Sequence, residues 1–498
     1  MEGKRISVIG AGISGISAAA YAAKAGHDVH VYEKNATPGG RARQFETHNG
    51  YVFDMGPSWY WMPDIINGFF RDFGYDASDF YKLVPLDPQF EIIFSNGRMK
   101  VPSDYGQLKA LFASIEPGAD RQLDAFMKAA RYKYEAGMNE FVQKPCHSWW
   151  EFASPKIAAS AFRLNLLSNY RSYVKQYFSH PWLISLMEFP VIFLGASPKQ
   201  IPALYSLMAY GGYALGTWYP MGGFYQLVLA MKKVAEEQGA CFHFNSPVEQ
   251  INTSRKLVTG LQIAGQDHLC DAVIASSDYS HTETMLPPAL RNYNKEYWES
   301  RTFAPSCLIY YLGVNTSIPN IRHHTLFFEH DLDTHVDEIY QSRQWPSKPL
   351  FYVCCPSKTD AAVAPAGHEN LFLLMPLSTG LEDNESIRER YLNTMLRRIE
   401  KATGCKDLAT KIDYSKSYCV RDFIHDYNAY GGNAYGLANT LKQTAVGKPA
   451  IRSRKLDNLL FTGQLTVPGP GVPPSLISGK IAAAEIKNLK KFSFEKSI

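Results

Sequence analysis

The first residues alternate between short apolar runs and a glycine-rich turn. Ile6, Val8 and Ile9 form the first apolar run, residues 16–25 are rich in alanine, and residues 29–32 form a second apolar run. Short β-branched runs are typical of buried strands, and a small-residue run of ten is typical of a packed helix. The pattern predicts a strand, a helix and a second strand, which is one βαβ unit of a parallel sheet.

The rest of the chain changes pattern several times. Residues 100–215 are helix-like stretches dense in aromatic residues, and residues 219–251 are a glycine turn with an amphipathic helix and a strand. Residues 271–278 then read as a short buried strand, and residues 300–415 contain several strand-like runs. Residues 458–486 read as a strand, a Pro/Gly loop and a helix. Returns to a βα pattern after long interruptions indicate a domain that is assembled from separate segments.

We therefore predict an α/β fold with a Rossmann-type domain built from three chain segments and an inserted second domain of the α+β class. The predicted segments of the first domain are residues 1–90, 219–298 and 416–498. The predicted second domain consists of a helical region at residues 91–218 and a sheet at residues 299–415.

Composition supports two domains and excludes some partners. The chain has 498 residues, and a single hydrophobic core stops growing at about 250–300 residues. Charged residues make up 20%, below the roughly 25% of an average globular protein, which suggests contact with something apolar. The net charge of +4 comes without a basic stripe or a nucleic-acid motif, so we expect no nucleic-acid partner.

The cysteines and histidines indicate neither disulfides nor a metal site. The eight cysteines contain no C-x-x-C pair, and a reducing, cytosolic setting fits this pattern best. His323, His324 and His330 lie close together in the sequence, but no carboxylate shares a metal-ligand spacing with them. We expect no metal.

Two stretches resemble targeting or membrane segments. Lys4 and Arg5 precede a small-residue apolar run, as in a signal peptide, but the glycine spacing described next favours a nucleotide-binding turn. The longest apolar stretch, residues 183–196, is interrupted by Glu188 and Pro190, so it falls short of the roughly 18 apolar residues of a membrane span.

Gly10, Gly12 and Gly15 form the motif G-x-G-x-x-G between the first predicted strand and its helix, and Glu33 follows the second strand. The first glycine permits a tight turn, the second lets a diphosphate approach the backbone, and the third allows close helix–strand packing. The helix N-terminus attracts the diphosphate, and Glu33 would bind ribose hydroxyls. The alternative is a packed βα corner without a ligand.

A second motif lies just beyond the acid. It consists of Gly39, Gly40 and Arg41, followed by Asp54, Gly56, Pro57 and Ser58. This arrangement resembles the FAD-dependent amine oxidase superfamily, and within it the bacterial phytoene-desaturase-type carotenoid desaturases. The resemblance implies that Arg41 steadies the FAD diphosphate and that Gly56, Pro57 and Ser58 line the edge of the flavin.

Three later blocks extend the resemblance over nearly the whole chain. They contain Gly222 and Gly223, then Val248, then Gly463, Gln464, Gly469, Gly471 and Val472. By resemblance, the backbone of Val248 holds the adenine, and N–H groups near Gly471 and Val472 reach the pyrimidine end of the flavin. Gln464 departs from the family pattern, because many relatives have an acid or a small residue there.

Trp59, Tyr60 and Trp61 directly follow the Gly-Pro-Ser turn. If that turn approaches the flavin, the three rings can form the wall of a slot for a rod-shaped apolar substrate, because flat rigid side chains bury area at little entropic cost. The alternative is that they pack the junction of the two domains, as most aromatic residues do.

The resemblance implies a reaction at a carbon–carbon single bond of a long acyclic or monocyclic carotenoid. A hydride passes to the flavin and a proton leaves the neighbouring carbon. The sequence identifies no catalytic acid or base; Glu188, His180 and Arg171 are candidates, with ordinary structural roles as the alternative. The electron acceptor is a quinone or oxygen.

Two substrates remain open. Relatives with this aromatic motif desaturate phytoene or the 3,4 bond of a 1-hydroxylated carotenoid, and we place phytoene slightly ahead. A terminal hydroxyl could meet polar side chains in the helical region, namely His147, Asn165, Asn169 and Tyr173.

A carotenoid substrate implies contact with a membrane surface. We expect a cytoplasmic protein, peripheral on the inner face of the membrane, with residues 162–193 as the interface and with Arg163, Arg171 and Lys175 near lipid headgroups. The C-terminal Lys487, Lys490 and Lys491 could add to it, or could form a solvated end.

Three other classes share the fold. A carotenoid isomerase or saturase would use FAD without this net oxidation. A lipid-binding relative of the GDP-dissociation-inhibitor type would not use flavin as a catalyst, which the intact glycine motif and flavin segment argue against. A plain amine oxidase would carry a different C-terminal pattern.

Overall fold

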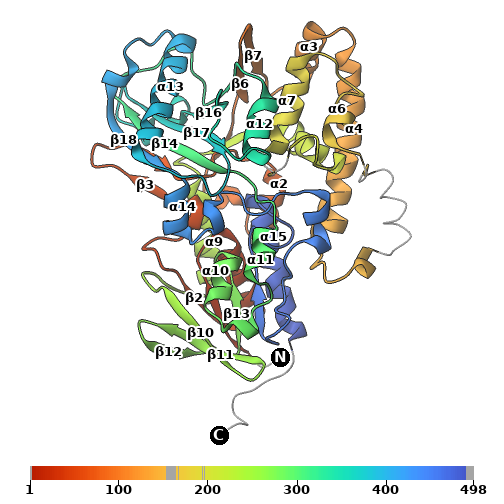
Figure 1. Cartoon of the computed structure of the whole chain (residues 1–498), viewed down its shortest axis with the longest axis vertical. Helices are drawn as coiled ribbons and strands as arrows, with labels where there is room; N and C mark the ends of the chain where they lie inside the picture. Colours follow the sequence, from red (N-terminus) through yellow and green to blue (C-terminus); the bar gives the residue numbers. More distant parts are fainter. Residues whose placement is uncertain (1–2, 153–163, 166–167, 193–194, 196, 490–498) are drawn as a thin grey trace.

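The structure, a computed structural model, describes residues 3–152, 164–165, 168–192, 195 and 197–489. Two large sheets divide it into two parts, which lie one above the other in Figure 1. The chain passes between these parts several times, so each is assembled from distant segments.

The first part is built on a parallel five-stranded sheet. Its strands lie in the order β19 (Leu459–Phe461), β13 (Ala272–Ala275), β1 (Arg5–Ile9), β2 (Asp28–Tyr32) and β9 (Cys241–His243). Ile6 lies between Ala272 and Val29 in the register. These strands come from three separated stretches of the chain, in agreement with the expected α/β fold.

One helix of this part packs closely against two others. Helix α1 (Ile13–Lys24) packs against α15 (Val472–Glu485) and α9 (Tyr225–Glu237). A Cβ added at Gly479 of α15 would lie 2.4 Å from the carbonyl oxygen of Ser14 and 2.7 Å from the backbone nitrogen of Ala18. Only a glycine therefore permits this approach of α15 to α1.

The second part contains a mixed seven-stranded sheet. Its order is β18 (Ile412–Tyr418), β14 (Ser306–Val314), β17 (Glu369–Leu377), β16 (Phe351–Cys354), β15 (His324–Phe328), β6 (Phe90–Phe94) and β7 (Gly97–Val101). Neighbours are antiparallel except β15 and β6, which are parallel. Strands β14, β16 and β6 are buried along their whole length, so the sheet is covered on both faces there.

Strands β6 and β7 differ from the expectation for their stretch. The sequence assigns residues 91–218 to the helical region of the second domain, whereas residues 90–101 form a hairpin in the sheet of that part. In β7 only alternate residues, Met99 and Val101, are buried, which is the period of a strand. The helices follow after this hairpin.

The helical elements of this stretch are α3 (Tyr105–Ile115), α4 (Ala119–Ala136), α6 (Tyr170–Val174), α7 (Pro181–Ile192) and α8 (Leu207–Ala209). Most of α7 is buried, including Glu188 and Pro190. A helix that is apolar all round belongs to a core, so α7 does not supply the membrane interface expected from its sequence.

Arg163, Lys490 and Lys491 lie outside the described residues, as do residues 162 and 193.

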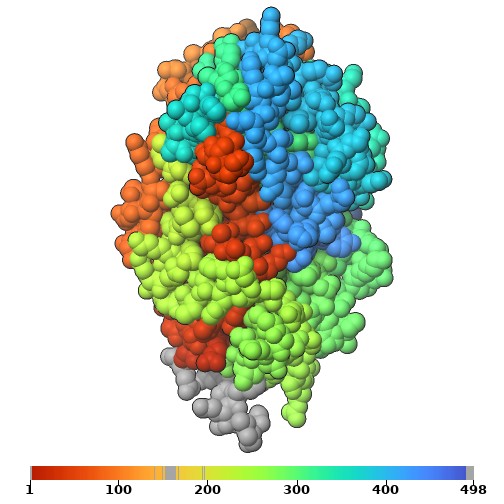
Figure 2. All heavy atoms as spheres, turned by 90° about the vertical axis from the view of Figure 1, so that its left-hand side faces the viewer, coloured from red at the N-terminus to blue at the C-terminus, as the bar shows by residue number. Residues whose placement is uncertain are grey.

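Smaller elements complete the molecule. They are the antiparallel sheet of β10 (Val248–Ser254), β11 (Leu257–Ile263) and β12 (Gln266–Leu269), the pairs β3 (Gln44–Glu46) with β4 (Val52–Asp54) and β5 (Leu83–Pro85) with β8 (Trp218–Pro220), and the helices α2 (Pro63–Asp72), α10 (Tyr279–Thr284), α11 (Lys295–Glu299), α12 (Leu332–Tyr340), α13 (Glu385–Thr403) and α14 (Val420–Tyr427). Figure 2 shows residues near the N-terminus lying directly against the blue C-terminal third, where the rings of Phe45 and Tyr414 are 6.2 Å apart. Among the described residues, no helix combines the length and apolarity required to cross a bilayer.

The contact between α1 and α15 predicts a sensitive position. Gly479→Ala should lower the free energy of unfolding by about 1–3 kcal/mol, because the new methyl group overlaps backbone atoms that cannot move aside. Gly68→Ala in α2 is the control, because no atom lies within 4 Å of its added Cβ; it should be neutral or stabilise by about 0.5–1 kcal/mol. Urea unfolding of both variants measures the difference, and equal stability would contradict this account of the helix contact.

Candidate functional site

A cavity of about 1090 Å³ lies between the two parts of the molecule. Residues from β1, α1, α15 and the second sheet line it. All but two of the residues predicted to bind the cofactor or to form the substrate wall line it, namely Gly10, Gly12, Glu33, Gly40, Arg41, Gly56, Pro57, Ser58, Trp59, Trp61, Val248, Gly463, Gln464, Gly471 and Val472. Gly15 and Tyr60 do not line it.

The turn at the start of α1 leaves donors free for a ligand. Gly10 has a φ of 94° and donates its N–H to the carbonyl of Tyr32 at 2.8 Å. Gly12 caps α1 without a side-chain hydrogen bond, and the first turn holds no acidic residue. The unpaired N–H groups and the helix dipole therefore favour an anion here. Gly15 acts by packing, because a Cβ there would lie 2.0 Å from the carbonyl oxygen of Gly10.

Glu33 is fixed at the far end of the cavity by the backbone around it. Its two carboxylate oxygens accept hydrogen bonds from the N–H of Ala11 at 2.8 Å and from the N–H of Asn35 at 2.9 Å. The residue is 5% exposed. This geometry holds an acceptor in a fixed orientation beside the glycine turn, as recognition of a ribose requires.

Arg41 brings a cation into the cavity with few partners. One Nη donates to the carbonyl of Asn433 at 3.1 Å, and the guanidinium lies 4.9 Å from the centroid of the Tyr427 ring. The buried Nε has no hydrogen-bond partner, and no carboxylate within the described part of the chain forms an ion pair with Arg41. Burial lowers the pKa of Arg41. A diphosphate would supply the missing counter-charge.

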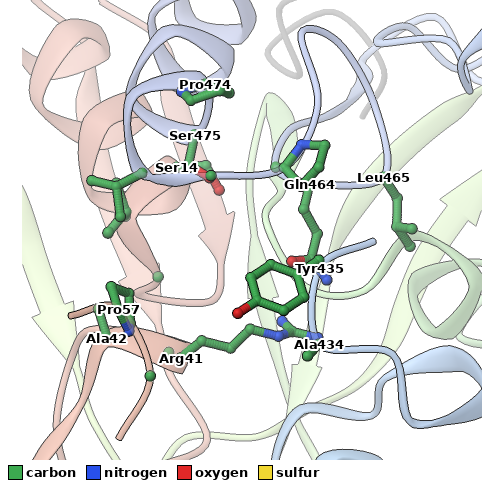
Figure 3. A pocket seen from close by; sticks show the side chains of 18 of the residues that line it. Ser14, Arg41, Ala42, Pro57, Ala434, Tyr435, Gln464, Leu465, Pro474 and Ser475 are labelled. Carbon is green, nitrogen blue, oxygen red and sulfur yellow. The ribbon is translucent and has the colours of Figure 1, made fainter. Parts of the chain in front are cut away.

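Figure 3 shows Arg41 from the second motif, Ser14 from α1 and Ser475 from α15 around the same pocket. The glycines bring these segments together: a Cβ at Gly40 would lie 3.3 Å from the Cα of Gly12, and one at Gly56 would lie 2.6 Å from the carbonyl oxygen of Arg41. Close backbone contact thus explains Gly40 and Gly56 of the second motif.

Helix α15 begins at the same cavity. Gly471 caps it with no side-chain hydrogen bond, and Pro473 and Pro474 carry no N–H. The N–H of Ser475 already bonds to the carbonyl of Gly471. Val472 is therefore the residue of this first turn whose N–H is open to a ligand, which agrees with the donor that the resemblance implies.

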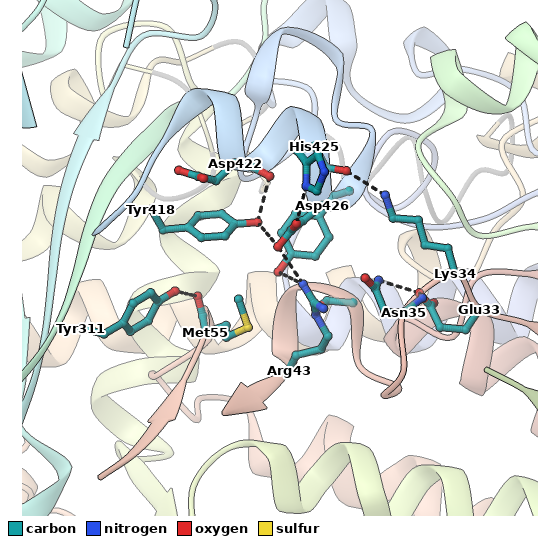
Figure 4. Close-up of polar contacts among 12 residues, drawn as sticks. Glu33, Lys34, Asn35, Arg43, Met55, Tyr311, Tyr418, Asp422, His425 and Asp426 are labelled. Atoms are coloured by element: carbon teal, nitrogen blue, oxygen red, sulfur yellow. Dashed lines mark hydrogen bonds and ion pairs between the residues drawn. The ribbon is translucent and has the colours of Figure 1, made fainter. Parts of the chain in front are cut away.

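Helix α14 closes one side of the cavity with contacts that no motif in the sequence indicates. Lys34 donates to the carbonyl of His425 at 2.8 Å, and Arg43 forms an ion pair with Asp426 at 3.1 Å (Figure 4). Asp426 and Tyr427 line the cavity. Their positions depend on tertiary packing, so sequence reasoning had no signal for them.

Alternation of the backbone explains the block of aromatics. Tyr60 pairs with Trp218 of β8 in an antiparallel bridge, and successive side chains of an extended segment point to opposite sides. Trp59 and Trp61 face the cavity, with ring centroids 5.4 Å apart. Tyr60 is 1% exposed and its hydroxyl is 2.7 Å from that of Tyr81, in the core of the first part. We leave Tyr60 out of the predicted substrate wall.

The acid–base candidates taken from the helical region do not line the cavity. Arg171 forms ion pairs with Glu188 and Asp333 between α6, α7 and α12. The backbone N–H of His180 donates to Glu116 at 2.7 Å. These groups hold helices together, and the alternative structural roles fit them.

The polar residues proposed to meet a terminal hydroxyl also lie elsewhere. His147 bonds to Glu485 at 3.0 Å, Asn169 caps α6, and the hydroxyl of Tyr173 is 3.2 Å from that of Tyr177. Neither these three nor Asn165 lines the cavity. Hydroxyl-bearing side chains that do line it include Ser58, Tyr205, Tyr352 and Tyr435, and the ring of Tyr352 lies 5.4 Å from that of Trp59.

His323, His324 and Cys354 hold donor atoms within 4.8 Å of one another. The Nδ1 atoms of both histidines already bond to hydroxyls, of Thr359 at 2.7 Å and of Tyr352 at 2.6 Å. We interpret the group as a buried hydrogen-bonded network, and the absence of a metal stays a prediction from the sequence.

Residues 13–487 match the family described as flavin containing amine oxidoreductase. The chain belongs to this family. It is an FAD-dependent oxidoreductase, so the fold class and the cofactor expected from the sequence are confirmed.

Individual relatives cover almost the whole chain. A carotenoid 3,4-desaturase of Haloarcula japonica is 40% identical over 486 residues, which are 97% of this chain and 98% of that protein. A zeta-carotene-forming phytoene desaturase of Myxococcus xanthus is 29% identical over 495 residues, 97% of this chain and 94% of that protein. An oxidoreductase from Methanosarcina mazei shares the fold, with a TM-score of 0.61 at 16% identity over 97% of this chain and 100% of that chain.

The residues at the cavity fit FAD. The glycine turn and Arg41 suit the diphosphate, Glu33 suits the ribose, and the open N–H of Val472 suits a carbonyl or an anionic ring edge. The uncompensated cation of Arg41 is the observation that calls for a bound anion.

We expect Arg41→Gln to weaken FAD binding by about 1.5–3 kcal/mol, because it removes charge-assisted hydrogen bonds; this corresponds to about a 10- to 100-fold higher Kd. Flavin absorbance after gel filtration and titration of the apoprotein measure it. Arg71→Gln, at an exposed position of α2, is the charge-matched control. Unchanged affinity in Arg41→Gln would remove Arg41 from the diphosphate site.

Proposed function

We propose that this enzyme is a carotenoid desaturase, which removes a hydride and a proton from a carbon–carbon single bond of a long polyene. The observation that carries the proposal is the continuity of one cavity from the nucleotide end at Glu33 to the aromatic wall at Trp59 and Trp61. The names of the two similar enzymes from Haloarcula japonica and Myxococcus xanthus support the same substrate class.

The proposed bond is the 3,4 bond of a carotenoid, with phytoene as the second candidate. This reverses the order that the sequence alone favoured. The change is supported by the 40% identity to the Haloarcula japonica carotenoid 3,4-desaturase, against 29% to the Myxococcus xanthus phytoene desaturase. A hydroxylated end of the substrate would find hydroxyl donors and acceptors at Tyr205 and Tyr435 in the cavity wall.

The chain's own residues position and shield the reacting bond. When bound, FAD supplies the two-electron oxidation by accepting the hydride. Trp59, Trp61 and Phe189 provide rigid apolar surface that can align a polyene and exclude water from it. Alignment of this kind lowers the barrier because the reactants are already in place.

A carotenoid must enter from a lipid phase, so we propose that the enzyme works as a peripheral protein on the cytoplasmic face of a membrane. Trp150 is 85% exposed, and Leu441, which lines the cavity, is 54% exposed. Leu441 is thus an exposed apolar side chain at the cavity itself, and the need of the substrate for a lipid phase is the main support for this proposal. A quinone in that membrane, or oxygen, would reoxidise the flavin.

The substrate assignment predicts a pattern of products. Purified enzyme with FAD, an electron acceptor and liposomes should convert a 1-hydroxylated carotenoid into a product whose absorption maximum lies at longer wavelength, because one more double bond joins the polyene. Phytoene offered in parallel should react at least tenfold more slowly. Chromatography of the pigments measures both, and faster conversion of phytoene would assign the enzyme to phytoene desaturation instead.

The aromatic wall predicts a contrast between neighbours. Trp59→Ala and Trp61→Ala should each lower kcat/KM by about 10- to 100-fold, which corresponds to about 1.4–3 kcal/mol of lost contact. Tyr60→Phe should leave kcat/KM unchanged and cost about 1 kcal/mol of stability, because it loses only the bond to Tyr81. If all three variants turned over like the parent, the rings would be packing residues only.

A further inference from the structure

The hydroxyl of Tyr352 is a polar group in an apolar stretch of the cavity wall. Tyr352 lines the cavity together with Trp59, Phe189 and Leu374. Its hydroxyl donates to the Oγ of Ser58 at 3.0 Å and lies 2.6 Å from the Nδ1 of His324. One end of this hydrogen-bonded chain therefore meets the cavity, and the other end is an imidazole.

His324 is reached from the cavity through Tyr352. It does not line the cavity, because the indole of Trp59 covers it, with ring centroids 4.2 Å apart and planes inclined by 12°. The residue is 0% exposed and its Nε2 has no hydrogen-bond partner. Burial, with the neighbouring His323, holds the pKa of His324 well below its ordinary value, so the resting imidazole is neutral. The Tyr352 hydroxyl can turn from Ser58 to Nδ1 of His324, and the neutral imidazole then holds the proton only transiently because its pKa is low.

We propose that Tyr352 takes the proton that the substrate loses and that His324 is the base behind it. The assignment rests on the proposed desaturation. One C–H bond of the substrate breaks with its electron pair, which leaves as hydride to FAD. The electrons of the C–H bond on the neighbouring carbon form the new double bond, and its proton passes to Oη of Tyr352 while the hydroxyl proton of Tyr352 passes to Nδ1 of His324. Tyr352 is thus the catalytic residue, and His324 acts through it.

A second, small cavity of about 20 Å³ offers a route for the proton to leave. Ser58, His323 and Asp54 line it, and Ser58 also lines the large cavity. A space of this size holds one water molecule. Burial raises the pKa of Asp54 to about 6, so its carboxylate can receive a proton that reaches the small cavity through Ser58.

The alternative role for Tyr352 is to anchor a terminal hydroxyl of the substrate. The two roles differ in kinetics. A proton acceptor affects the chemical step, so its loss lowers kcat; an anchor affects binding of the hydroxylated substrate, so its loss raises KM for that substrate.

The test compares Tyr352→Phe, His324→Asn and the double variant, with Tyr170→Phe as the control. Tyr170 is also fully buried and its hydroxyl bonds to the carbonyl of Met187, away from the cavity. We expect kcat to fall about 100-fold or more in each single variant, with KM and FAD content unchanged. The double variant should lose no more than either single variant, because the two residues act as one unit. Tyr170→Phe should change melting temperature but not kcat.

Each of the following results would overturn the assignment. A higher KM with unchanged kcat in Tyr352→Phe would make the residue a hydroxyl anchor. Additive losses in the double variant, or a loss of FAD content that accounts for the lower rate, would make the pair structural. A parent enzyme that binds FAD but converts neither carotenoid would overturn the proposed desaturation and this assignment with it, whereas an active parent beside equally active variants would overturn the proton assignment alone.

Discussion

The site depends on one close contact between two helices from opposite ends of the chain. Gly479 of α15 lies so near Ser14 of α1 that no side chain fits between them, and this contact brings both helix N-termini to the same cavity. Each N-terminus has a glycine cap without a side-chain partner. Two sets of free N–H donors therefore face the same cavity, one at the glycine turn of α1 and one at Val472 of α15.

The second sheet completes what the helices begin. Strand β16 places Tyr352 beside Ser58, and Ser58 belongs to the same short segment as Gly56, which rests on the backbone of Arg41. The cofactor motif and the proposed proton acceptor are thus linked by a few residues of extended chain. A change in the packing of one sheet would therefore shift residues of the other through this segment.

Sequence reasoning located the parts of the site whose chemistry depends on the backbone. The glycines and Arg41 belong to motifs with fixed spacing, and their geometry follows from local sterics, so they could be predicted. Tyr352 and His324 could not, because strand pairing brings them to Ser58 across nearly three hundred residues. The aromatic block is an intermediate case, because the sequence indicated a wall of three rings. The bridge between Tyr60 and Trp218 directs the side chain of Tyr60 into the core, and the sequence alone does not show this bridge. The helical candidates Arg171 and Glu188 were misleading for the same reason, since their partner Asp333 lies on a distant helix.

The segmented first domain also has a consequence for biosynthesis. Its sheet needs β19, and its cavity needs the start of α15, and both elements lie more than four hundred residues after β1 and α1. A nascent polypeptide that has made β1, α1 and the glycine turn still lacks the second set of donors and the helix that packs on Ser14. The dinucleotide site is therefore completed only once residues 459–485 have been made, and truncation at residue 471 would remove cofactor binding and the packing of the first domain together.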